Sequence, residues 1–508
     1  MSRAPFLTTL TALGCLLTTT TAQADTAITY ADRSDALPRH AYTGGWEHFV
    51  GGGVAVFDCN ADGLADLFAA GGDSPARLMI NSSERGGALS FRSGQISDIT
   101  GVTGAYPIDI DSDGHLDLAV LRVGANMLLK GGPDCTFEDA GAAWGFDGGD
   151  RWTTAFSATW EAGADRPTLF FGNYVDRDNP DGPFEACDSN ELHRPTVDGW
   201  DKAVLEPGFC TLSALMSKGA RGATMLRLSN DRHYYVKGGY EQLYDLALDR
   251  FLTEEDGWDK VSLWGMGIAE RDVDGDAIAD VMLTSMGDQL LQFGMADGSY
   301  TAAPYDIGTY AQRPHVGEDG RASTGWHAAW GDVDNDADTD LFIAKGNVEQ
   351  MPSNAARDPN NLLIQGEDGR FTERSVEAGV ASLEKSRGAG LADLNGDGKL
   401  DLVVVNRGAP MQLYQNTTTD TGSYLDVSLY QAGANSSAVG SVIEVLTNRG
   451  LQTQEITIGG GHVSGQSVPL HFGLGKAEKV QVRVVWPDGE DSDWVEITPL
   501  NRWIELAR

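Results

Sequence analysis

Short apolar runs recur along the chain, and five of them directly follow an acidic loop of constant spacing. The last of these loops is Asp393-Leu-Asn-Gly-Asp-Gly-Lys-Leu-Asp401, and it leads straight into Leu402-Val-Val-Val405. Runs of β-branched and apolar residues bounded by Gly and Asp are typical of β-strands. The pattern therefore predicts a loop that joins two strands. The other four apolar runs are Leu67-Phe68, Leu118-Ala-Val120, Val281-Met-Leu283 and Leu341-Phe-Ile343.

The five loops place oxygen-bearing side chains at positions one, three, five and nine. Such an all-oxygen set suits a hard cation, and the ion that it predicts is Ca2+. An EF-hand would need Glu at position twelve between two helices, whereas position twelve is apolar in every loop. We therefore predict up to five calcium ions in loops between strands. The predicted ligands are Asp58, Asn60, Asp62, Asp66, Asp109, Asp111, Asp113, Asp117, Asp272, Asp274, Asp276, Asp280, Asp332, Asp334, Asp336, Asp340, Asp393, Asn395, Asp397 and Asp401.

Position six distinguishes the loops from one another. It is Gly63, Gly114 or Gly398 in three of them, and glycine permits the sharp turn that folds the oxygens round one ion. The other two loops carry Ala277 and Ala337. A Cβ in a left-handed turn costs about 1 kcal/mol, so these two loops are expected to bind more weakly.

The acidic loops also mark a repeat. They begin at residues 58, 109, 272, 332 and 393, and the gap of 163 residues after 109 is about three repeats long. Two degenerate copies, expected to keep the loop length without the ligands, begin at Trp160 and Ser217. Seven repeats of 51 to 61 residues, each with several short strands, predict an all-β fold with a seven-bladed β-propeller. The segment 27–34 is expected to supply the outer strand of the last blade.

The repeat phase stops after the polar linker 416–422. Alternation of apolar and polar residues in 424–430, 441–446 and 480–485 then indicates an antiparallel sandwich or barrel. We therefore predict a propeller over residues 25–419, with an insertion at about 174–210, and a small β domain over 420–508. The glycine runs 51–53 and 459–461 lack a strand-then-helix context, so we attribute them to close strand packing.

These motifs resemble two known families. The acidic loops are similar to the FG-GAP repeats of integrin α propellers. Three segments near the C-terminus carry a second resemblance: Gly433-Ala-Asn-Ser-Ser-Ala-Val-Gly440, Leu470-His-Phe-Gly-Leu-Gly475 and Val482-Arg-Val-Val-Trp-Pro-Asp-Gly489. They resemble the cartilage acidic protein/ASPIC-UnbV family, and together with the acidic loops they extend this resemblance over nearly the whole chain. The resemblance implies a calcium-binding propeller followed by a small β domain, and it implies little about substrate.

Charge and targeting signals restrict the partners and the compartment. The net charge of −37 argues against nucleic acid and against anionic membrane surfaces as partners. Residues 1–24 have the basic start, apolar centre and Ala-Gln-Ala end of a secretory signal peptide. No later stretch approaches the roughly 18 apolar residues of a membrane span. We therefore expect a secreted or periplasmic protein without membrane insertion.

Four cysteines follow the predicted signal peptide, an even number for an oxidising compartment. Three pairings are possible. We favour Cys187 with Cys210, because that bridge would hold the insertion in place, and this choice leaves Cys59 with Cys135. No Cys/His spacing typical of zinc sites is present.

Two classes of function fit this sequence. The first is a calcium-stabilised binding or adhesion module for an unidentified protein or carbohydrate ligand. The second is an enzyme, because polar residues are predicted to gather at the channel mouth opposite the calcium loops. The alternative to a site there is that these polar groups only cap strand ends. The candidate catalytic residues are Asp231, Arg232, His233 and His327, and the first class is preferred.

Overall fold

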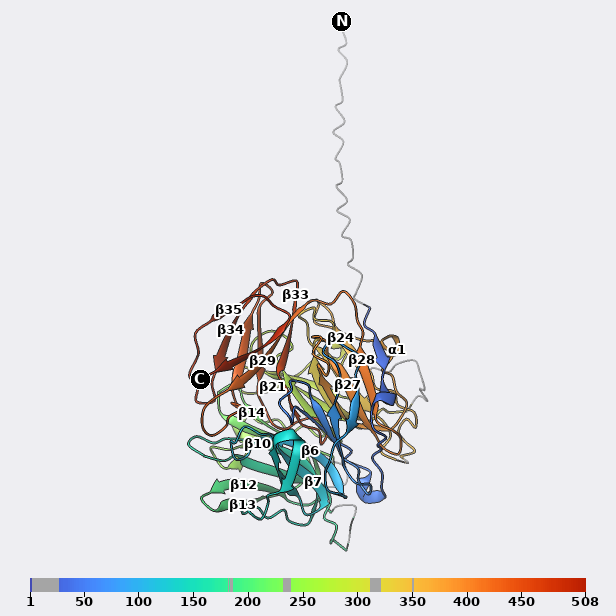
Figure 1. Cartoon of the computed structure of the whole chain (residues 1–508), viewed down its shortest axis with the longest axis vertical. Helices are drawn as coiled ribbons and strands as arrows, with labels where there is room; N and C mark the ends of the chain where they lie inside the picture. The colour runs from blue at the N-terminus through green and yellow to red at the C-terminus, as the bar shows by residue number, and fades with distance from the viewer. Residues whose placement is uncertain (2–26, 181, 183–185, 232–238, 311–320, 350) are drawn as a thin grey trace.

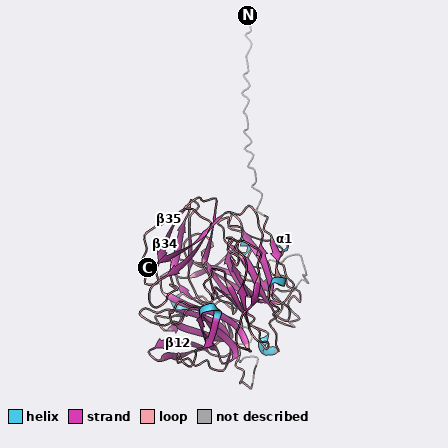
Figure 2. Ribbon diagram, in the orientation of Figure 1, coloured by secondary structure: helices cyan, strands magenta, loops and turns pink. Residues whose placement is uncertain are grey.

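The computed structural model describes residues 1, 27–180, 182, 186–231, 239–310, 321–349 and 351–508. The predicted signal peptide thus lies almost wholly outside the described residues. The described part is an all-β structure with the short helix α1 (Ser375–Ala378) and single 3-10 turns (Figures 1 and 2). The turns cover Ser34–Ala36, Trp46–His48, Pro133–Cys135, Glu254–Asp256 and Tyr305–Ile307. No described helix is long and apolar enough to cross a membrane.

Seven antiparallel units of four strands each follow one another along the described chain. Unit one is β2 (Val54–Phe57), β3 (Asp66–Ala69), β4 (Arg77–Asn81) and β5 (Phe91–Ser93); unit two is β6 (Val102–Ile108), β7 (Asp117–Gly124), β8 (Met127–Gly132) and β9 (Thr136–Asp139); unit three is β10 (Arg151–Thr159), β11 (Thr168–Asn173), β12 (Asn190–Thr196) and β13 (Gly199–Leu205). Unit four is β14 (Thr211–Lys218), β15 (Thr224–Asn230), β16 (Gln242–Asp245) and β17 (Arg250–Phe251); unit five is β18 (Gly265–Arg271), β19 (Asp280–Ser285), β20 (Leu290–Gly294) and β21 (Tyr300–Ala302). Unit six is β22 (Gly325–Gly331), β23 (Asp340–Lys345), β24 (Asn361–Gln365) and β25 (Phe371–Glu373); unit seven is β26 (Ser386–Ala392), β27 (Asp401–Asn406), β28 (Gln412–Asn416) and β1 (Tyr30–Asp32).

The seven units form a closed ring. The first strand of each unit contacts the first strand of the next, from β2 and β6 round to β26, which contacts β2 again. The second strands are buried along their whole length or nearly so, as their continuous apolar runs require. Apolar cores lie between neighbouring units, so each unit is covered on both faces.

The N-terminal strand closes the ring, as the sequence predicted. Strand β1 pairs antiparallel with β28, and Tyr30 lies opposite Asn416. Unit seven is therefore built from the two ends of the repeat region.

Units three and four differ from the prediction. The predicted insertion 174–210 is shorter in the structure, because β12 and β13 within it are the third and fourth strands of unit three. In unit four Lys218 pairs with Thr224, so the connecting turn is only 219–223. The eight-residue loop length survives in the degenerate copy of unit three, where Thr159 pairs with Thr168, but not in that of unit four.

Two further sheets follow the ring. One has the order β33 (Leu470–Gly475), β29 (Ser423–Tyr430), β36 (Arg502–Ala507), and the other has the order β31 (Leu451–Glu455), β30 (Val442–Leu446), β34 (Val480–Val485), β35 (Val495–Ile497). They share one apolar core. All their pairings are antiparallel except that of β29 with β36, which is parallel. Figure 1 shows these strands, coloured orange to red, gathered to one side of the units.

One segment of this C-terminal region enters the centre of the ring. We call residues 456–468 the channel segment; it contains β32 (Gln466–Ser467), which pairs in parallel with β2. Single bridges join it to four other first strands, at Ala105, Ala158, Leu215 and Ile268. It also bonds to the first strands of units six and seven, through His327 and Leu391. The channel segment thus contacts the first strand of every unit.

Glycines make this close approach possible. A Cβ on Gly53 would lie 1.8 Å from the carbonyl oxygen of Val463, and one on Gly461 would lie 2.4 Å from the ring of His327. These distances confirm that the glycine runs 51–53 and 459–461 serve close packing. Their shared location in the channel was not predicted.

Candidate metal-binding loops

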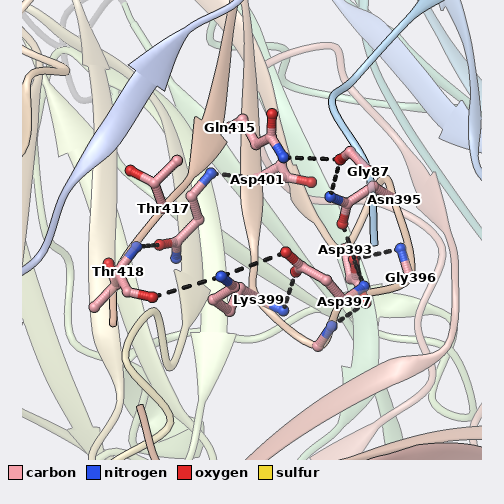
Figure 3. Close-up of polar contacts among 12 residues, drawn as sticks. Gly87, Asp393, Asn395, Gly396, Asp397, Lys399, Asp401, Gln415, Thr417 and Thr418 are labelled. Carbon is pink, nitrogen blue, oxygen red and sulfur yellow. Dashed lines mark hydrogen bonds and ion pairs between the residues drawn. The ribbon is translucent and has the colours of Figure 1, made fainter. Parts of the chain in front are cut away.

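The five acidic loops have one backbone geometry. In each, the residue before position one pairs with position nine, as Ala392 does with Asp401. Eight residues therefore separate the two strands. The carboxylate at position one accepts a hydrogen bond from the backbone N–H of position six, and position five accepts one from position seven. In the last loop these bonds measure 2.7 Å to Asp393 and 3.1 Å to Asp397 (Figure 3).

Position six has the left-handed backbone that the sequence predicted. Its φ is 79° at Gly63, 86° at Gly114, 68° at Ala277, 78° at Ala337 and 80° at Gly398. Two loops therefore hold a Cβ in a conformation that favours glycine.

Position nine has a role that sequence analysis missed. In every acidic loop one oxygen of this Asp accepts a hydrogen bond from the backbone N–H of position two. The other accepts one from the backbone N–H of the last or next-to-last residue of the unit's third strand. For Asp401 the donors are the backbone amides of Leu394, at 3.1 Å, and Asn416, at 2.8 Å. The five side chains are almost fully buried. Position nine thus ties the loop to two strands, and the remaining lone pairs of its oxygens can still face an ion.

Three loops bring carboxylate oxygens within 4.8 Å of one another. They are formed by Asp109, Asp111 and Asp117, by Asp272, Asp274 and Asp276, and by Asp332, Asp334 and Asp336. Two buried oxygens in these groups have no hydrogen-bond partner in the described structure: Oδ1 of Asp111 and Oδ1 of Asp334. An unpartnered buried carboxylate oxygen is costly unless a cation faces it, so these side chains fit a bound metal ion.

The loops at 58 and 393 have an amide at position three. The Asn60 side chain donates to Asp62 at 2.9 Å. The Asn395 side chain donates to the carbonyl of Gly87 at 2.7 Å, and Gln415 donates to the same carbonyl at 2.9 Å (Figure 3). The last loop is therefore fastened to unit one across the closure of the ring.

Burial governs the electrostatics of these loops. Desolvation raises the pKa of Asp66, Asp280 and Asp336 to about 7 and that of Asp117 to about 8, with neighbouring carboxylates adding to the effect. The loop at 109 has an internal cation, because Nζ of Lys130 lies 2.7 Å from Asp113 and also contacts Asp111. Burial alone would raise the pKa of Asp113, but the hydrogen bond from Lys130 outweighs burial and lowers that pKa.

The predicted disulfides are both present, Cys59–Cys135 and Cys187–Cys210. Asp66 lies beside the first pair. Since these sulfurs are bonded to each other, that group offers no thiolate to a metal. Paired cysteines are typical of an extracellular or otherwise oxidising compartment.

The two candidate catalytic residues that the structure describes, Asp231 and His327, are both buried. His327 is 4% exposed, and its Nδ1 accepts from the backbone N–H of His462 in the channel segment at 3.0 Å. Desolvation lowers the pKa of His327 to about 4 and that of His462 to about 3, so both rings are neutral near pH 7. Asp231 is buried and accepts from the hydroxyl of Tyr174 at 2.5 Å. Arg232 and His233 lie outside the described residues.

Other polar groups on that side fasten the strands together. At the end of the second strand of unit three, Asn173 accepts from Thr153 at 2.8 Å, and Asn230 and Asn406 have the same kind of hydroxyl partner. Arg387 is fully buried, stacks 4.1 Å from the ring of Trp326 and donates to four backbone carbonyls. These contacts correspond to the strand-capping alternative.

Comparison with known proteins places two segments in families. Residues 431–507 match the family described as ASPIC and UnbV, and residues 58–120 match the FG-GAP-like repeat. Over 167 residues the chain is 29% identical to cartilage acidic protein 1 of Homo sapiens, covering 31% of this chain and 24% of that protein. The Mus musculus protein is 28% identical over a segment that covers 25% of its length. The matched segment therefore spans about a quarter of these relatives.

Among solved structures, BBS1N in its complex with ARL6DN has a TM-score of 0.46 at 8% identity, covering 78% of this chain and 99% of that one. The sequence matches confirm the predicted resemblance. The chain carries an FG-GAP-like repeat and an ASPIC/UnbV domain, and it is distantly similar to cartilage acidic protein 1.

Proposed function

We propose that this chain is an exported binding module, a seven-bladed β-propeller whose acidic loops hold structural calcium ions. The observation that carries this proposal is the buried Oδ1 of Asp334, 5% exposed as a residue and without a hydrogen-bond partner, inside a loop that collects three carboxylates. The backbone amides already hold positions one and five in place. An ion would supply the missing contact and offset the repulsion between the carboxylates.

The side chains of each loop would have two different roles. Positions one, three and five would face the ion, and position nine fastens the loop to the neighbouring strands. Bound calcium would supply positive charge. Since any ligand that binds only the folded state stabilises it, each filled loop adds about 2.7 kcal/mol at a hundredfold excess over its dissociation constant.

The partner of such a module is a protein or a carbohydrate. The net charge of −37 disfavours polyanions as partners. The alternative of an enzyme at the channel mouth has less support, because the channel segment contacts all seven first strands and His327 is buried against it.

Metal analysis and calorimetry test the proposal. The purified protein is expected to hold up to five calcium ions, and excess chelator should lower its melting temperature sharply. Magnesium should restore the melting temperature poorly, because that ion demands a smaller octahedral shell. Asp334→Asn should remove one ion and part of the stabilisation by calcium. Asp147→Asn removes the same charge from a side chain that is 82% exposed, and it should change neither quantity. The proposal would be refuted if the purified protein carried no metal and its melting temperature were the same in calcium and in chelator.

A further inference from the structure

The C-terminal region covers the acidic loops unequally. Its residues form several hydrogen bonds with the loop at 332 and pack against the loop at 393. In each of the loops at 109 and 272 they donate one hydrogen bond to the Asp at position one. Among the described residues, no side chain of 420–508 forms a hydrogen bond or ion pair with the loop 58–66, and β32 pairs with Val56 and Phe57 just before it. One chain thus holds a covered acidic loop and an open one with the same backbone geometry.

The covered loop is bonded to the C-terminal region through its backbone. The amide of Gly422 donates to the carbonyl of Asp334 at 3.0 Å, and the amide of Gly475 donates to that of Asn335 at 2.8 Å. The Asn335 side chain adds a third contact, since its Oδ1 lies 2.7 Å from Nε2 of His471. These contacts hold position three, Asp334 itself, and position four, the residue after it.

Two further contacts close the surroundings of the loop. The backbone of Gly473 lies so close that a Cβ there would be 1.8 Å from Oδ2 of Asp332. One guanidinium nitrogen of Arg449 donates to both carboxylate oxygens of Asp338, at 2.8 and 3.0 Å. Position one is thus covered by β33, and position seven is fixed by a cation at the rim.

Burial of the carboxylates follows this coverage. Asp332 and Asp334, at positions one and three, are 4% and 5% exposed. In the open loop Asp58 is half-buried and Asp62 is exposed. The region that covers the loop at 332 therefore removes water from positions one and three, while Asp336 at position five stays half-buried. An ion in this loop would be enclosed on the side of β33.

We propose that seating of the C-terminal region on the loop at 332 controls the metal ion of that loop. The seated region encloses the ion, which raises its affinity and slows its release, and by linkage the ion holds the region in place. This inference rests on the proposed calcium function. The loop at 58 serves as the internal reference, because its ion would exchange without any movement of the C-terminal region.

Calcium release into a fluorescent chelator, followed by stopped flow on the full chain, tests the inference. The wild-type protein should show a slow phase that Asp334→Asn removes and a faster phase that Asp62→Asn removes. Coupling energies between sites usually correspond to about 5- to 150-fold. We therefore expect the slow phase to accelerate by such a factor when the seat is loosened.

Two variants loosen the seat without altering a ligand. In Gly422→Ala the new Cβ would lie 1.9 Å from the carbonyl of Asn335, and His471→Ala removes the contact to the same residue. Gly45→Ala, whose Cβ meets nothing within 4 Å, is the control. Equal release from both loops, or a slow phase that neither variant accelerates, would overturn the inference while leaving calcium binding intact. Absence of any bound calcium would instead overturn the proposed function.

Discussion

Gly53→Ala is the sharpest test of how the channel segment holds the ring together. A Cβ on Gly53 would lie 1.8 Å from the carbonyl oxygen of Val463, and contacts below 3.0 Å essentially never occur. The two groups must therefore separate by at least 3.0 − 1.8 = 1.2 Å. The backbone of Gly53 is not left-handed, so the strain that alanine would meet there comes from this collision and from the Cα of Gly104, 3.1 Å from the new Cβ.

The loss of folding free energy depends on which group has to move. The obstacle is a backbone carbonyl in a segment bridged to several units, and it cannot rotate away as the end of a side chain could. Overpacking of this kind costs about 1–3 kcal/mol. At roughly 2 °C per kcal/mol for a large chain, the melting temperature should fall by about 2–6 °C.

A second glycine makes the test specific to the channel segment. Gly104, on the next first strand, faces the same Val463 carbonyl, and its Cβ would lie 2.1 Å away. Since the two alanines share the Val463 carbonyl and lie next to each other, the loss in the double variant should differ from the sum of the two single losses. Calorimetry in saturating calcium measures all three variants, with Gly45→Ala as the control. A Gly53→Ala protein as stable as the wild type, or strictly additive losses, would refute the reasoning.

Three further predictions concern the loops and a disulfide. Ala337→Gly should stabilise the protein and Gly114→Ala should destabilise it, each by about 1 kcal/mol, since φ is 78° and 86° at these positions; calorimetry that showed both changes neutral would contradict this. Burial raises the pKa of carboxyls such as Asp117, which reaches about 8, whereas the unfolded value is near 4. The folded state without calcium therefore binds more protons than the unfolded state, and its free energy of unfolding should fall as the pH rises from about 5 to 8. A melting temperature that rose over this interval without calcium would refute that prediction. Reduction of Cys187–Cys210, which spans 23 residues, should remove roughly 3 kcal/mol of constraint and increase hydrogen exchange there most; unchanged exchange within the bridge would contradict it.

The repeat could be predicted from sequence because its cause is local. An Asp at position nine must sit at the start of a strand, and apolar residues such as Leu402 and Val404 must follow it to fill the space between units. This requirement fixes the spacing of the loops, and the seven units were predicted from it. The pairing of β1 with β28 was predicted separately, from the likeness of segment 27–34 to the outer strand of another repeat. In unit four no ligand keeps the loop length constant, and the turn there shortened to 219–223.

The contents of the channel could not be predicted in the same way. The phase of the repeat shows which residues lie at one end of the strands, but it does not show whether solvent or protein covers them. His327 was placed at the correct end and then found beneath His462, 135 residues further along the chain. The signal that was present is the pair of glycine runs, 51–53 and 459–461, since two such runs can mark two backbones that approach each other.

The pairing of β1 with β28 also has a consequence for the order of assembly. Tyr30 and Asn416 are separated by 416 − 30 = 386 residues, so the strand synthesised first is among the last to find its place. Loop closure over such a distance is slow compared with the formation of hairpins within a unit. During folding the first six units can therefore be complete while the seventh still shows an unpaired edge, and a chaperone that protects this intermediate would need to cover β28 rather than the acidic loops.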